Sequence, residues 1–557
     1  MKRVVYGMGM VAALLGGMGA VPSRAANCPV GGAIPCIPAA DTTAGLLARS
    51  PGVGDDAQDG HAVGDLWQVG GRVWQAVSVQ PGAAQWQMLP DTTLPGDVFG
   101  TRTRFAGGTV RLVRGYVGPA LDVEVTHQGQ QQTRTLNLTA QGGLDTAPLQ
   151  ERDPGTYAFV TRVYDQSGHG HALEATAGRH VVHIGEVRIA GAEAMSWGEA
   201  NGPGGFVIPA DMRLDTSGFF FSTLGTYASS NAGYAAYPVP LVLGQEGLGF
   251  KVFFGSYSLD GFVHVADNAS PDQKLDLVVN NAPAMFSVWR QGTAMRVRSG
   301  NIHAMGQNLA SAAALAGGYL GYNADGGPWF SQGRNTGQWT GVVLADHISD
   351  PEQVSHFQAA VARQINAMPQ VRRTVVTIGD SRTEGYQVPD GRNWPWLMQA
   401  NMRYQSYNLA VSGATTRHML GMLPAAARVA VHAGERVAVV FGGFNDHIQK
   451  TAIPYEETVE NLGQIVSQLQ GMKYHVVLVE EAASDSVLRA QLHAAVQDGR
   501  IRPDSVVDPF APGHPLADPS NPQYWVGDMT HPSALGQAEL ARCIWRAVSV
   551  YFPERRP

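Results

Sequence analysis

The pattern of apolar and polar positions divides the chain into a strand-rich part and a part in which strands and helices alternate. From about residue 100 to residue 365, short apolar or alternating runs are separated by Gly, Asn, Asp and Pro. Many short strands bounded by turn residues predict a β-sandwich or jelly roll. The clearest runs cover residues 110–115, 120–127, 157–165, 180–189, 251–259, 274–280 and 294–300.

After residue 371 the pattern becomes a short apolar strand, a loop and a helix, repeated along the chain. The strands are nearly all apolar, as strands buried on both faces of a sheet are. Such alternation predicts a parallel sheet with helices on both sides, which is a three-layer α/β fold. Strands are expected at 374–378, 406–411, 437–441, 475–482 and 504–510, and helices at 392–404, 417–434, 458–472, 486–499 and 534–548.

Length and composition fit a multidomain globular protein. At about 150 residues per domain, the 557 residues predict three to four domains. Hydrophobic residues make up 44% of the chain and charged residues 15%, which excludes an intrinsically disordered protein. We divide the chain into a signal peptide at 1–26, a linker at 27–40, a small β-rich module at 41–98, the β-sandwich at 99–366 and the α/β unit at 367–557.

The first residues have the pattern of an export signal. Lys2 and Arg3 precede an apolar, Gly-rich run at residues 4–21, and the small residues around Ser23 and Ala25 offer a cleavage site. A membrane anchor is the alternative, but glycines weaken the run, and no later stretch is long and apolar enough to span a bilayer. We therefore predict a secreted or periplasmic protein without an integral membrane segment in the mature chain.

The three cysteines exclude a disulfide-dense scaffold and a four-thiolate metal site. Cys28 and Cys36 bracket a Pro/Gly loop and could pair after export, whereas Cys543 lies in an apolar helical stretch and is predicted to be buried. Histidines cluster at positions 169, 171, 180 and 183, but their spacing fits no closed zinc pattern. The sequence therefore predicts no metal and no cofactor.

Tryptophans in two places are candidates for ligand contacts. Trp67, Trp74 and Trp86 lie among the alternating residues of the small module, and Trp394 and Trp396 lie in the α/β unit. In the module they would serve sugar stacking or assembly, and in the α/β unit they would line a cleft. The alternative at both places is a packed core, which we predict because large aromatic side chains contribute most when buried.

Candidate functional residues lie where the predicted strands of the α/β unit end and before its last helix. Ser381 follows the first strand, Gly413 the second and Asn445 the third, and Asp528 and His531 precede the last helix. Because the carboxyl ends of parallel strands meet at one edge of a sheet, we expect these residues to converge there. A serine, a histidine and an aspartate with hydrogen-bond donors nearby are the groups that acyl transfer requires.

The chemistry suggests a role for each residue type. A serine hydroxyl is a poor nucleophile until a base takes its proton, and histidine has the unperturbed pKa nearest to neutral. A carboxylate holds the imidazole in the correct tautomer, and Asp528 lies three residues before His531. The backbone N–H groups of Ser381 and Gly413 and the side chain of Asn445 would donate hydrogen bonds to an oxyanion.

These motifs resemble the conserved blocks of the SGNH (GDSL-type) serine hydrolases. The matching segments, in family order over roughly residues 371–552, are 378–381, 408–415, 443–446 and 528–531. The resemblance implies that Ser381 is the nucleophile, His531 the base and Asp528 its orienting carboxylate, with Ser381, Gly413 and Asn445 as the oxyanion hole. Phe444 departs from the small or polar residue usual in the family, and we expect its ring to shape the acyl pocket.

Parts of the strand-rich region are similar to carbohydrate-related domains. Residues 116–125, 144–149 and 163–176 resemble the start of the concanavalin-like domain of fungal-type α-L-arabinofuranosidases. Residues 318–361 resemble the end of laminin-G and legume-lectin-like domains, where a short helix closes the unit. No pair of carboxylates can be matched to the arabinofuranosidase catalytic positions. The resemblance therefore implies a carbohydrate-binding or spacer domain with a concanavalin-like jelly-roll fold.

Together the two resemblances imply an exported carbohydrate esterase that removes acyl groups, acetyl above all, from a polysaccharide or oligosaccharide. The net charge of −7 and the lack of a basic stripe exclude nucleic acid as a partner and suit a neutral glycan. Three alternatives stay open. They are a polysaccharide O-acyltransferase that uses Ser381, a carbohydrate-binding or adhesion protein with a vestigial hydrolase domain, and a glycosidase that acts through the middle domain.

Overall fold

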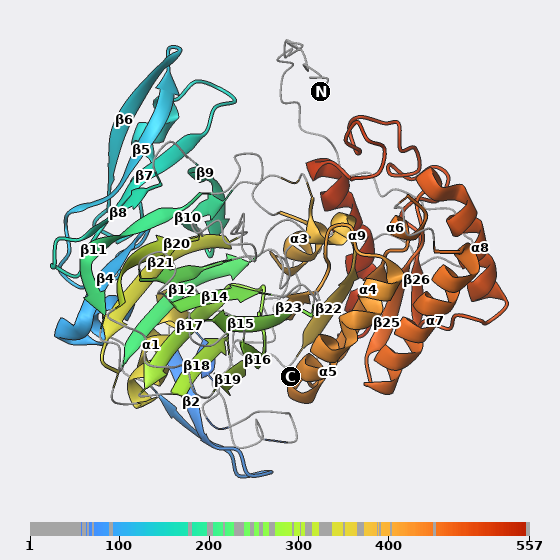
Figure 1. Cartoon of the computed structure of the whole chain (residues 1–557), viewed down its shortest axis with the longest axis horizontal. Coiled ribbons are helices and arrows are strands. Elements are labelled where there is room, and N and C mark those ends of the chain that lie inside the picture. Colours follow the sequence, from blue (N-terminus) through green and yellow to red (C-terminus); the bar gives the residue numbers. More distant parts are fainter. Residues whose placement is uncertain are drawn as a thin grey trace.

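The computed structural model places a β-sandwich beside a three-layer α/β unit (Figure 1). Among the described residues, no helix combines the length and the apolar character that crossing a membrane requires. The predictions for the signal peptide, for Cys28 and Cys36 and for His180 lie outside the described residues. The structure describes residues 57, 63, 66–69, 72–88, 93–176, 181–197, 204–214, 218–227, 239–244, 250–254, 260–266, 273–291, 294–300, 302–306, 315–321, 337–348, 351–364, 373–386, 388, 392–400, 404–448 and 453–552.

A small antiparallel sheet precedes the sandwich. Its strands are β1 (Leu66–Val69), β2 (Arg72–Ser78) and β3 (Gln85–Met88). Trp67 pairs with Trp74 across the first two strands, and Ala76 pairs with Trp86 across the second and third. Ala76 is buried, but Trp74 and Trp86 are only half-buried. The two rings therefore do not form the fully buried aromatic core that the sequence predicts for this module.

The sandwich is built from antiparallel strands whose pairing order closes on itself. One sheet holds, in spatial order, β19 (Ile302–Gly306), β18 (Ala294–Ser299), β17 (Ala284–Gln291), β12 (Phe219–Tyr227), β21 (Gly337–Asp346) and β4 (Thr103–Gly108). The other holds β16 (Gln273–Val278), β15 (Phe262–Ala266), β14 (Phe250–Phe254), β13 (Leu241–Leu243), β20 (Leu315–Leu320), β11 (Phe206–Leu214), β8 (Ala172–Ala175), β7 (Ala158–Tyr164), β5 (Pro119–His127) and β6 (Gln130–Asn137). Strands β9 (Val182–Ile189) and β10 (Ala192–Trp197) join the sheets by pairing with β7 and β21. The predicted β-sandwich is confirmed.

Strand β12 shows how the sandwich separates its interior from its outer face. Phe219 and Phe221 belong to the main core, where the Phe219 ring lies 5.2 Å from the ring of Phe250. Phe220 points to the other side, where its ring lies 4.8 Å from Phe357 of helix α1 (Pro351–Gln364). This alternation follows from the two-residue period of a strand. It places α1 against the outer face of the sheet as a closing helix.

The predicted strand at residues 110–115 is wrong, because this segment forms only an isolated bridge between Val110 and Gly143. Leu112 is fully buried, yet its N–H donates to the side chain of Gln166 at 2.7 Å and its carbonyl accepts from Gly96 at 2.8 Å. The apolar pattern therefore reflects a buried loop whose backbone hydrogen bonds go to a side chain and a turn.

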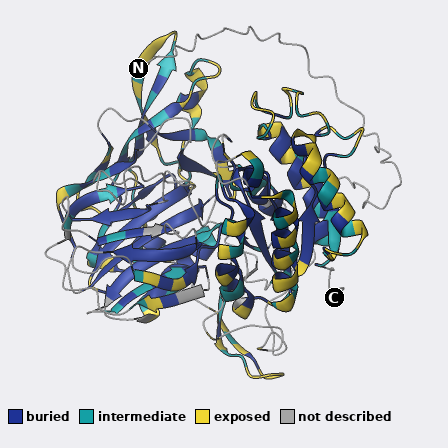
Figure 2. Ribbon diagram, turned by 45° about the vertical axis from the view of Figure 1, so that its right-hand side comes forward, coloured by how far each residue is buried: buried dark blue, intermediate teal, exposed yellow. Residues whose placement is uncertain are grey.

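The α/β unit is built on a five-stranded parallel sheet. Its strands, in spatial order, are β23 (Gln405–Asn408), β22 (Thr374–Gly379), β24 (Arg436–Phe441), β25 (His475–Val479) and β26 (Ser505–Val507). One face packs on α3 (Trp394–Ala400) and α9 (Ala534–Ser549), and the other on α5 (Leu423–His432), α7 (Tyr455–Gly471) and α8 (Ser486–Gln497). Figure 2 shows the buried strands between helices whose outer sides are exposed. The predicted three-layer α/β fold is confirmed.

The helices of the α/β unit agree with the sequence predictions in part. The single helix expected at 417–434 is two helices, α4 (Thr416–Gly421) and α5, because Pro424 lacks an N–H and fits only the first turn of a helix. Trp394 is fully buried in the core, as predicted. Trp396 is partly buried and packs against the sandwich residues Val187 and Ile189.

The sandwich and the α/β unit are joined by hydrogen bonds along strand β23. The Asn281 N–H donates to the Ser406 carbonyl at 2.7 Å, and the Asn281 side-chain oxygen accepts from the Asn408 N–H at 2.6 Å. The side-chain oxygen of Asn280 accepts from the Ser406 N–H at 3.2 Å. Asn281 is buried, so the interface excludes water where these groups meet. A sandwich loop thus completes the backbone hydrogen bonding of β23.

Replacing Asn281 by alanine tests this interface. Asn281→Ala leaves the buried Asn408 N–H without its acceptor, which costs about 1–3 kcal/mol. We expect the free energy of unfolding in urea to fall by this amount and the amides of residues 405–408 to exchange hydrogen faster. Asn137→Ala, at an exposed position on β6, is the control and should change neither measurement. Unchanged exchange at residues 405–408 in Asn281→Ala would contradict a supporting role for this side chain.

Candidate active site

Ser381 begins the short helix α2 (Ser381–Glu384) directly after strand β22. Asp380 caps this helix, because its side chain accepts a hydrogen bond from the Arg382 N–H at 3.0 Å. Gly379 must be glycine, since a Cβ there would lie 2.4 Å from the Phe441 carbonyl oxygen. Gly379 and Phe441 are also paired in the sheet. The sequence therefore brings Ser381 out at the carboxyl edge of the two central strands.

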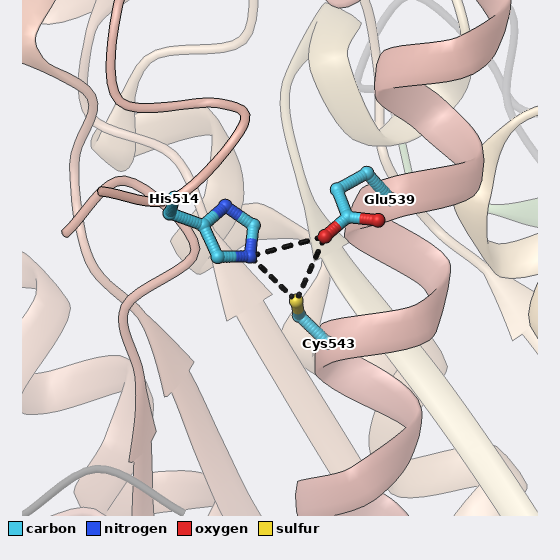
Figure 3. Close-up of side chains that lie close together, drawn as sticks. All are labelled: His514, Glu539 and Cys543. Atoms are coloured by element: carbon cyan, nitrogen blue, oxygen red, sulfur yellow. Dashed lines mark hydrogen bonds and ion pairs between the residues drawn. The ribbon is translucent and has the colours of Figure 1, made fainter. Parts of the chain in front are cut away.

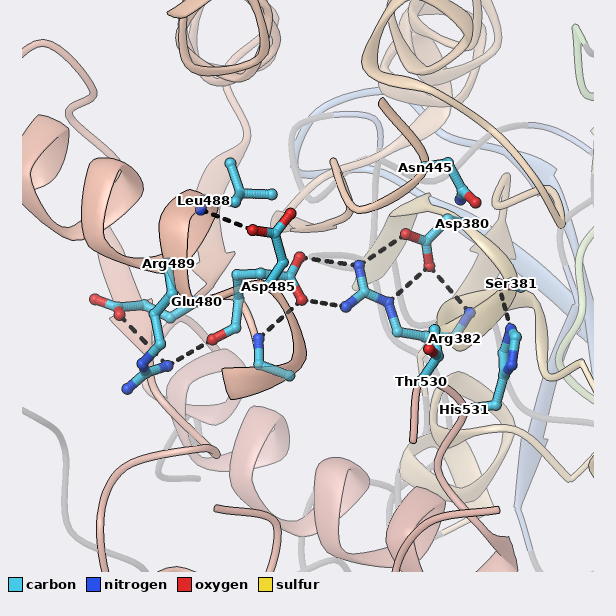
Figure 4. A network of polar contacts seen from close by, with 12 residues as sticks. Asp380, Ser381, Arg382, Asn445, Glu480, Asp485, Leu488, Arg489, Thr530 and His531 are labelled. Carbon is cyan, nitrogen blue, oxygen red and sulfur yellow. Dashed lines mark hydrogen bonds and ion pairs between the residues drawn. The ribbon is translucent and has the colours of Figure 1, made fainter. Parts of the chain in front are cut away.

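Asp528 and His531 lie in a tight turn before helix α9. Asp528 Oδ1 accepts from the N–H groups of Thr530 and His531, both at 2.9 Å. Met529, which lies between Asp528 and Thr530, adopts a left-handed φ of 57°. His531 Nδ1 lies 2.6 Å from Asp528 Oδ2. On its other side, His531 Nε2 lies 2.7 Å from Ser381 Oγ (Figure 4). The structure thus brings these three sequence-selected residues into one hydrogen-bonded chain.

The electrostatics of this chain favour an ionised aspartate. Burial would raise the pKa of Asp528, but hydrogen bonds from the His531 N–H, the His531 ring and the Thr530 N–H outweigh it and lower the pKa below its ordinary value. Ser381 is buried, and the side chain of His531 is 15% exposed. A hydroxyl held against an imidazole that a carboxylate orients can pass its proton to the ring during nucleophilic attack.

Gly413 and Asn445 lie in loops after the strands on either side of β22. The Val411 N–H donates to the Gly379 carbonyl at 3.3 Å, which holds the Gly413 loop beside β22. Gly413 has a φ of 78°, a left-handed conformation that favours glycine. Asn445 begins α6 (Asn445–Ile448), and its Nδ2 donates to the Ala414 carbonyl at 3.1 Å. The two loops therefore adjoin each other at the edge where Ser381 emerges.

A buried carboxylate fixes the loop that carries Asn445. Asp446 is fully buried and accepts from the Thr416 N–H at 2.8 Å, from the Thr416 hydroxyl at 2.5 Å and from the Thr458 hydroxyl at 2.7 Å. These bonds join the start of α6 to helices α4 and α7. The position of Asn445 is therefore set by its neighbour as well as by its own contact.

The structure adds a buried arginine that sequence reasoning did not select. Arg382 follows Ser381, is 1% exposed and binds the carboxylate of Asp380 (Figure 4). It also binds the carboxylate of Glu481. Burial would lower the pKa of Arg382, but the two carboxylates outweigh it and raise the pKa, so the guanidinium stays charged. The sequence shows an arginine directly after the serine, but its partner Glu481 lies 99 residues away. The sequence therefore gave no indication of the pairing.

Tyr386 contacts His531, and Glu384 contacts the loop of Gly413. The Tyr386 ring lies 4.8 Å from the His531 ring, and Tyr386 is 38% exposed. The Glu384 carboxylate accepts from the Ser412 N–H, which connects helix α2 to the loop of Gly413. Phe444, expected to shape the acyl pocket, is buried.

His514, in the loop before helix α9, contacts Glu539 and Cys543 of that helix (Figure 3). His514 Nε2 lies 3.1 Å from Glu539 Oε1 and 3.2 Å from Cys543 Sγ. Imidazole, carboxylate and thiolate are all ligands of Zn²⁺, so among the described residues these three are a possible metal-binding set. Hydrogen bonds account for the cluster without an ion. The Leu516 N–H donates to Nδ1 at 3.4 Å, which leaves the proton of a neutral ring on Nε2 facing Glu539, and Arg542 pairs with the same carboxylate.

Part of the chain is similar to known hydrolases. Residues 377–539 match the model of the GDSL-like Lipase/Acylhydrolase family. A GDSL-like lipase from Bacteroides thetaiotaomicron VPI-5482 is 23% identical over 32% of this chain and 88% of its own, with a TM-score of 0.26. The psychrotrophic esterase EstA from Pseudoalteromonas sp. is 16% identical over 32% of this chain and 98% of its own, with a TM-score of 0.27. A GH54 α-L-arabinofuranosidase is 14% identical, with a TM-score of 0.39, and the match spans 49% of this chain but only 65% of the arabinofuranosidase. No curated protein matches the chain.

The contribution of the His514 cluster to the stability of the fold depends on pH, because Glu539 must be ionised to accept its hydrogen bonds. Burial would raise its pKa, but hydrogen bonds from Arg542 and His514 lower the pKa from 4.5 to about 2. A carboxyl whose pKa is lowered by folding stabilises the fold above its unfolded pKa, and this stabilisation is lost as the pH falls through the folded pKa. We expect the Tm of Glu539→Gln to lie below that of wild type near neutral pH and to approach it between about pH 4.5 and pH 2.

Thermal unfolding followed by circular dichroism across this pH range measures the effect. Glu460→Gln changes an exposed carboxylate on helix α7 and is the control, which should keep the wild-type pH dependence. A difference in Tm between Glu539→Gln and wild type that stays constant from neutral pH to pH 2 would show that the pKa of Glu539 is not lowered.

Proposed function

Residues 377–539 are a GDSL-like lipase/acylhydrolase domain, and we propose that it is a serine esterase working through an acyl-enzyme on Ser381. The observation that carries the proposal is the hydrogen-bonded chain from Asp528 through His531 to Ser381, with distances of 2.6 and 2.7 Å. This geometry activates a serine hydroxyl for attack on an acyl group. The family match supports a hydrolase, and the hydrogen-bonded chain supports these roles for the three residues.

The proposed reaction has two halves. Ser381 Oγ attacks the acyl carbonyl carbon while its proton moves to His531 Nε2, and the resulting oxyanion accepts hydrogen bonds from the Ser381 N–H, the Gly413 N–H and Asn445 Nδ2. The bond to the alcohol then breaks, and the alcohol leaves with the proton from His531. Water next adds to the acyl carbon as His531 takes its proton, and the acid leaves as Ser381 regains a proton.

For the substrate we propose acetyl esters of a polysaccharide, and for the compartment the cell exterior or the periplasm. The polymeric substrate is inferred from the resemblance of residues 116–125, 144–149 and 163–176 to a carbohydrate-related domain. Hydrogen bonds along β23 hold the sandwich in a fixed position beside the α/β unit. Arg428 of helix α5 adds an ion pair to Asp276 of β16 at 2.8 Å. The net charge of −7 suits a neutral glycan. The signal pattern of residues 1–26 supports export.

Labelling with a fluorophosphonate probe tests the nucleophile. The probe reacts with activated serines, so the wild type should be labelled and Ser381→Ala should not. Ser467→Ala removes an exposed serine of helix α7 and is the matched control, which should be labelled like the wild type. Absence of labelling in the wild type, or equal labelling of Ser381→Ala, would contradict the proposed esterase.

Release of acetate by the same set of variants, without the probe, tests the substrate. The wild type should release acetate from at least one member of a panel of O-acetylated polysaccharides, and Ser381→Ala should release none. Hydrolysis of p-nitrophenyl acetate without release from any glycan would remove the polysaccharide from the proposal. Acyl transfer to an added sugar would indicate an acyltransferase, and release of arabinose by Ser381→Ala would indicate a glycosidase in the sandwich.

Changing Asp528 to asparagine tests the orienting carboxylate. Asp528→Asn keeps the shape of the side chain, but its amide can hold the imidazole in the wrong tautomer. We expect kcat for p-nitrophenyl acetate to fall by about 10³–10⁴-fold, with little change in KM. Asp518→Asn, exposed in the same loop, is the control and should behave like the wild type. A kcat for Asp528→Asn close to that of the wild type would remove Asp528 from the mechanism.

A further inference from the structure

Arg382 carries a buried charge that takes part in none of the proposed steps of acyl transfer. The side chains of Arg382, Asp380 and Glu481 are each 1% exposed. Removing charged groups from water is costly, and a buried ion pair is often no more stabilising than apolar residues of similar volume. Stability alone is therefore a weak reason for this cluster, and its position next to Ser381 indicates a role in geometry.

Arg382 and Asp380 enclose Ser381 from both sides along the chain. Asp380 Oδ1 accepts from the Arg382 N–H at 3.0 Å and from Arg382 Nε at 3.1 Å, and Asp380 Oδ2 accepts from Arg382 Nη2 at 2.8 Å. These bonds close a ring around the peptide units before and after Ser381. A helix of four residues does not persist alone, so this ring holds the start of α2.

Glu481 anchors the other end of the guanidinium. Both Glu481 oxygens accept from Arg382, one of them from Nη2 at 3.1 Å. The Glu481 carbonyl accepts from Arg489 at 2.6 Å, and Arg489 pairs with Asp508 at 2.6 Å. Glu481 follows strand β25 and Asp508 follows β26. The network therefore connects Ser381 to the ends of two further strands of the sheet.

Aromatic rings fix the guanidinium on its remaining side. The central carbon of the Arg382 guanidinium lies 4.2 Å from the centre of the Phe441 ring and 5.4 Å from that of Phe444. Phe444 directly precedes Asn445, which carries a proposed oxyanion donor. A planar guanidinium can bind two carboxylates and stack on aromatic rings at once, whereas an ammonium group acts as a point charge. Arginine is therefore the residue that suits this position.

We propose that Arg382 is a positioning residue that holds Ser381 Oγ in line with His531 and holds the loop of Asn445 beside it. The inference rests on the esterase function proposed above and adds to it a residue that does not touch the substrate. Displacement of a catalytic group by about 1 Å costs around 100-fold in rate. Loss of Arg382 should therefore lower kcat and leave KM nearly unchanged, because the groups that bind the substrate stay in place.

Two substitutions separate geometry from charge. Arg382→Lys keeps the positive charge but loses the planar fork, and Arg382→Met removes both. We expect kcat for p-nitrophenyl acetate and the rate of fluorophosphonate labelling to fall by about 10–100-fold in Arg382→Lys and further in Arg382→Met, with KM within about twofold of the wild type. Hydrogen exchange of residues 379–386 should become faster in both variants, and this measurement does not depend on activity.

Two controls separate positioning from loss of folded protein. Arg417→Met breaks an exposed Arg–Glu pair with Glu457 and should leave kcat unchanged. Val123→Ala leaves a cavity in the core of the sandwich and should lower activity only in proportion to the unfolded fraction. Wild-type labelling rates in Arg382→Met, or losses that match those of Val123→Ala at equal folded fraction, would overturn the proposal. Failure of the esterase function is distinct, because the wild type itself would then not be labelled.

Discussion

The carboxyl edge of the parallel sheet depends on one buried guanidinium that satisfies two carboxylates. Arg382, Asp380 and Glu481 have almost no contact with water, so each charge must find its hydrogen-bond partners within the protein. Once Arg382 is inside, Asp380 and Glu481 cannot separate without leaving a charge uncompensated. The ends of β22 and β25 are held together in this way. The direction in which Ser381 points toward His531 is a consequence of that constraint.

The parts of the α/β unit that sequence reasoning predicted are those determined by local pattern and sheet topology. Short apolar runs alternating with helices are enough to predict a parallel sheet, and residues that follow parallel strands must meet at one edge. Ser381, Gly413 and Asn445 were selected for this reason, and their strands β22, β23 and β24 lie side by side. Asp528 and His531 could be paired because they share one turn. The sandwich was predicted equally well as a class, since turn residues separate its strands.

The parts that could not be predicted depend on contacts between residues far apart in the chain. Arg382 and Glu481 are 99 positions apart, and nothing in either segment indicates the other. Leu112 has the alternating pattern of a strand, but its backbone bonds a distant glutamine side chain instead of a neighbouring strand. His514 similarly finds Glu539 through the packing of a long loop on α9. In each case hydrogen bonding in the folded protein decides the partner, and no periodicity records it.

The pairing of the Asn280–Asn281 loop with β23 has a consequence for self-association. The outer strand of a sheet exposes unpaired N–H and C=O groups that recruit strands of other chains. Strand β23 is such an outer strand, but the sandwich already occupies the N–H groups of Ser406 and Asn408 and the Ser406 carbonyl. A hydrolase unit cut away from the sandwich would present a bare sheet edge and become prone to aggregation. The sandwich thus covers the open edge of the parallel sheet, and the α/β unit depends on its neighbour for that protection.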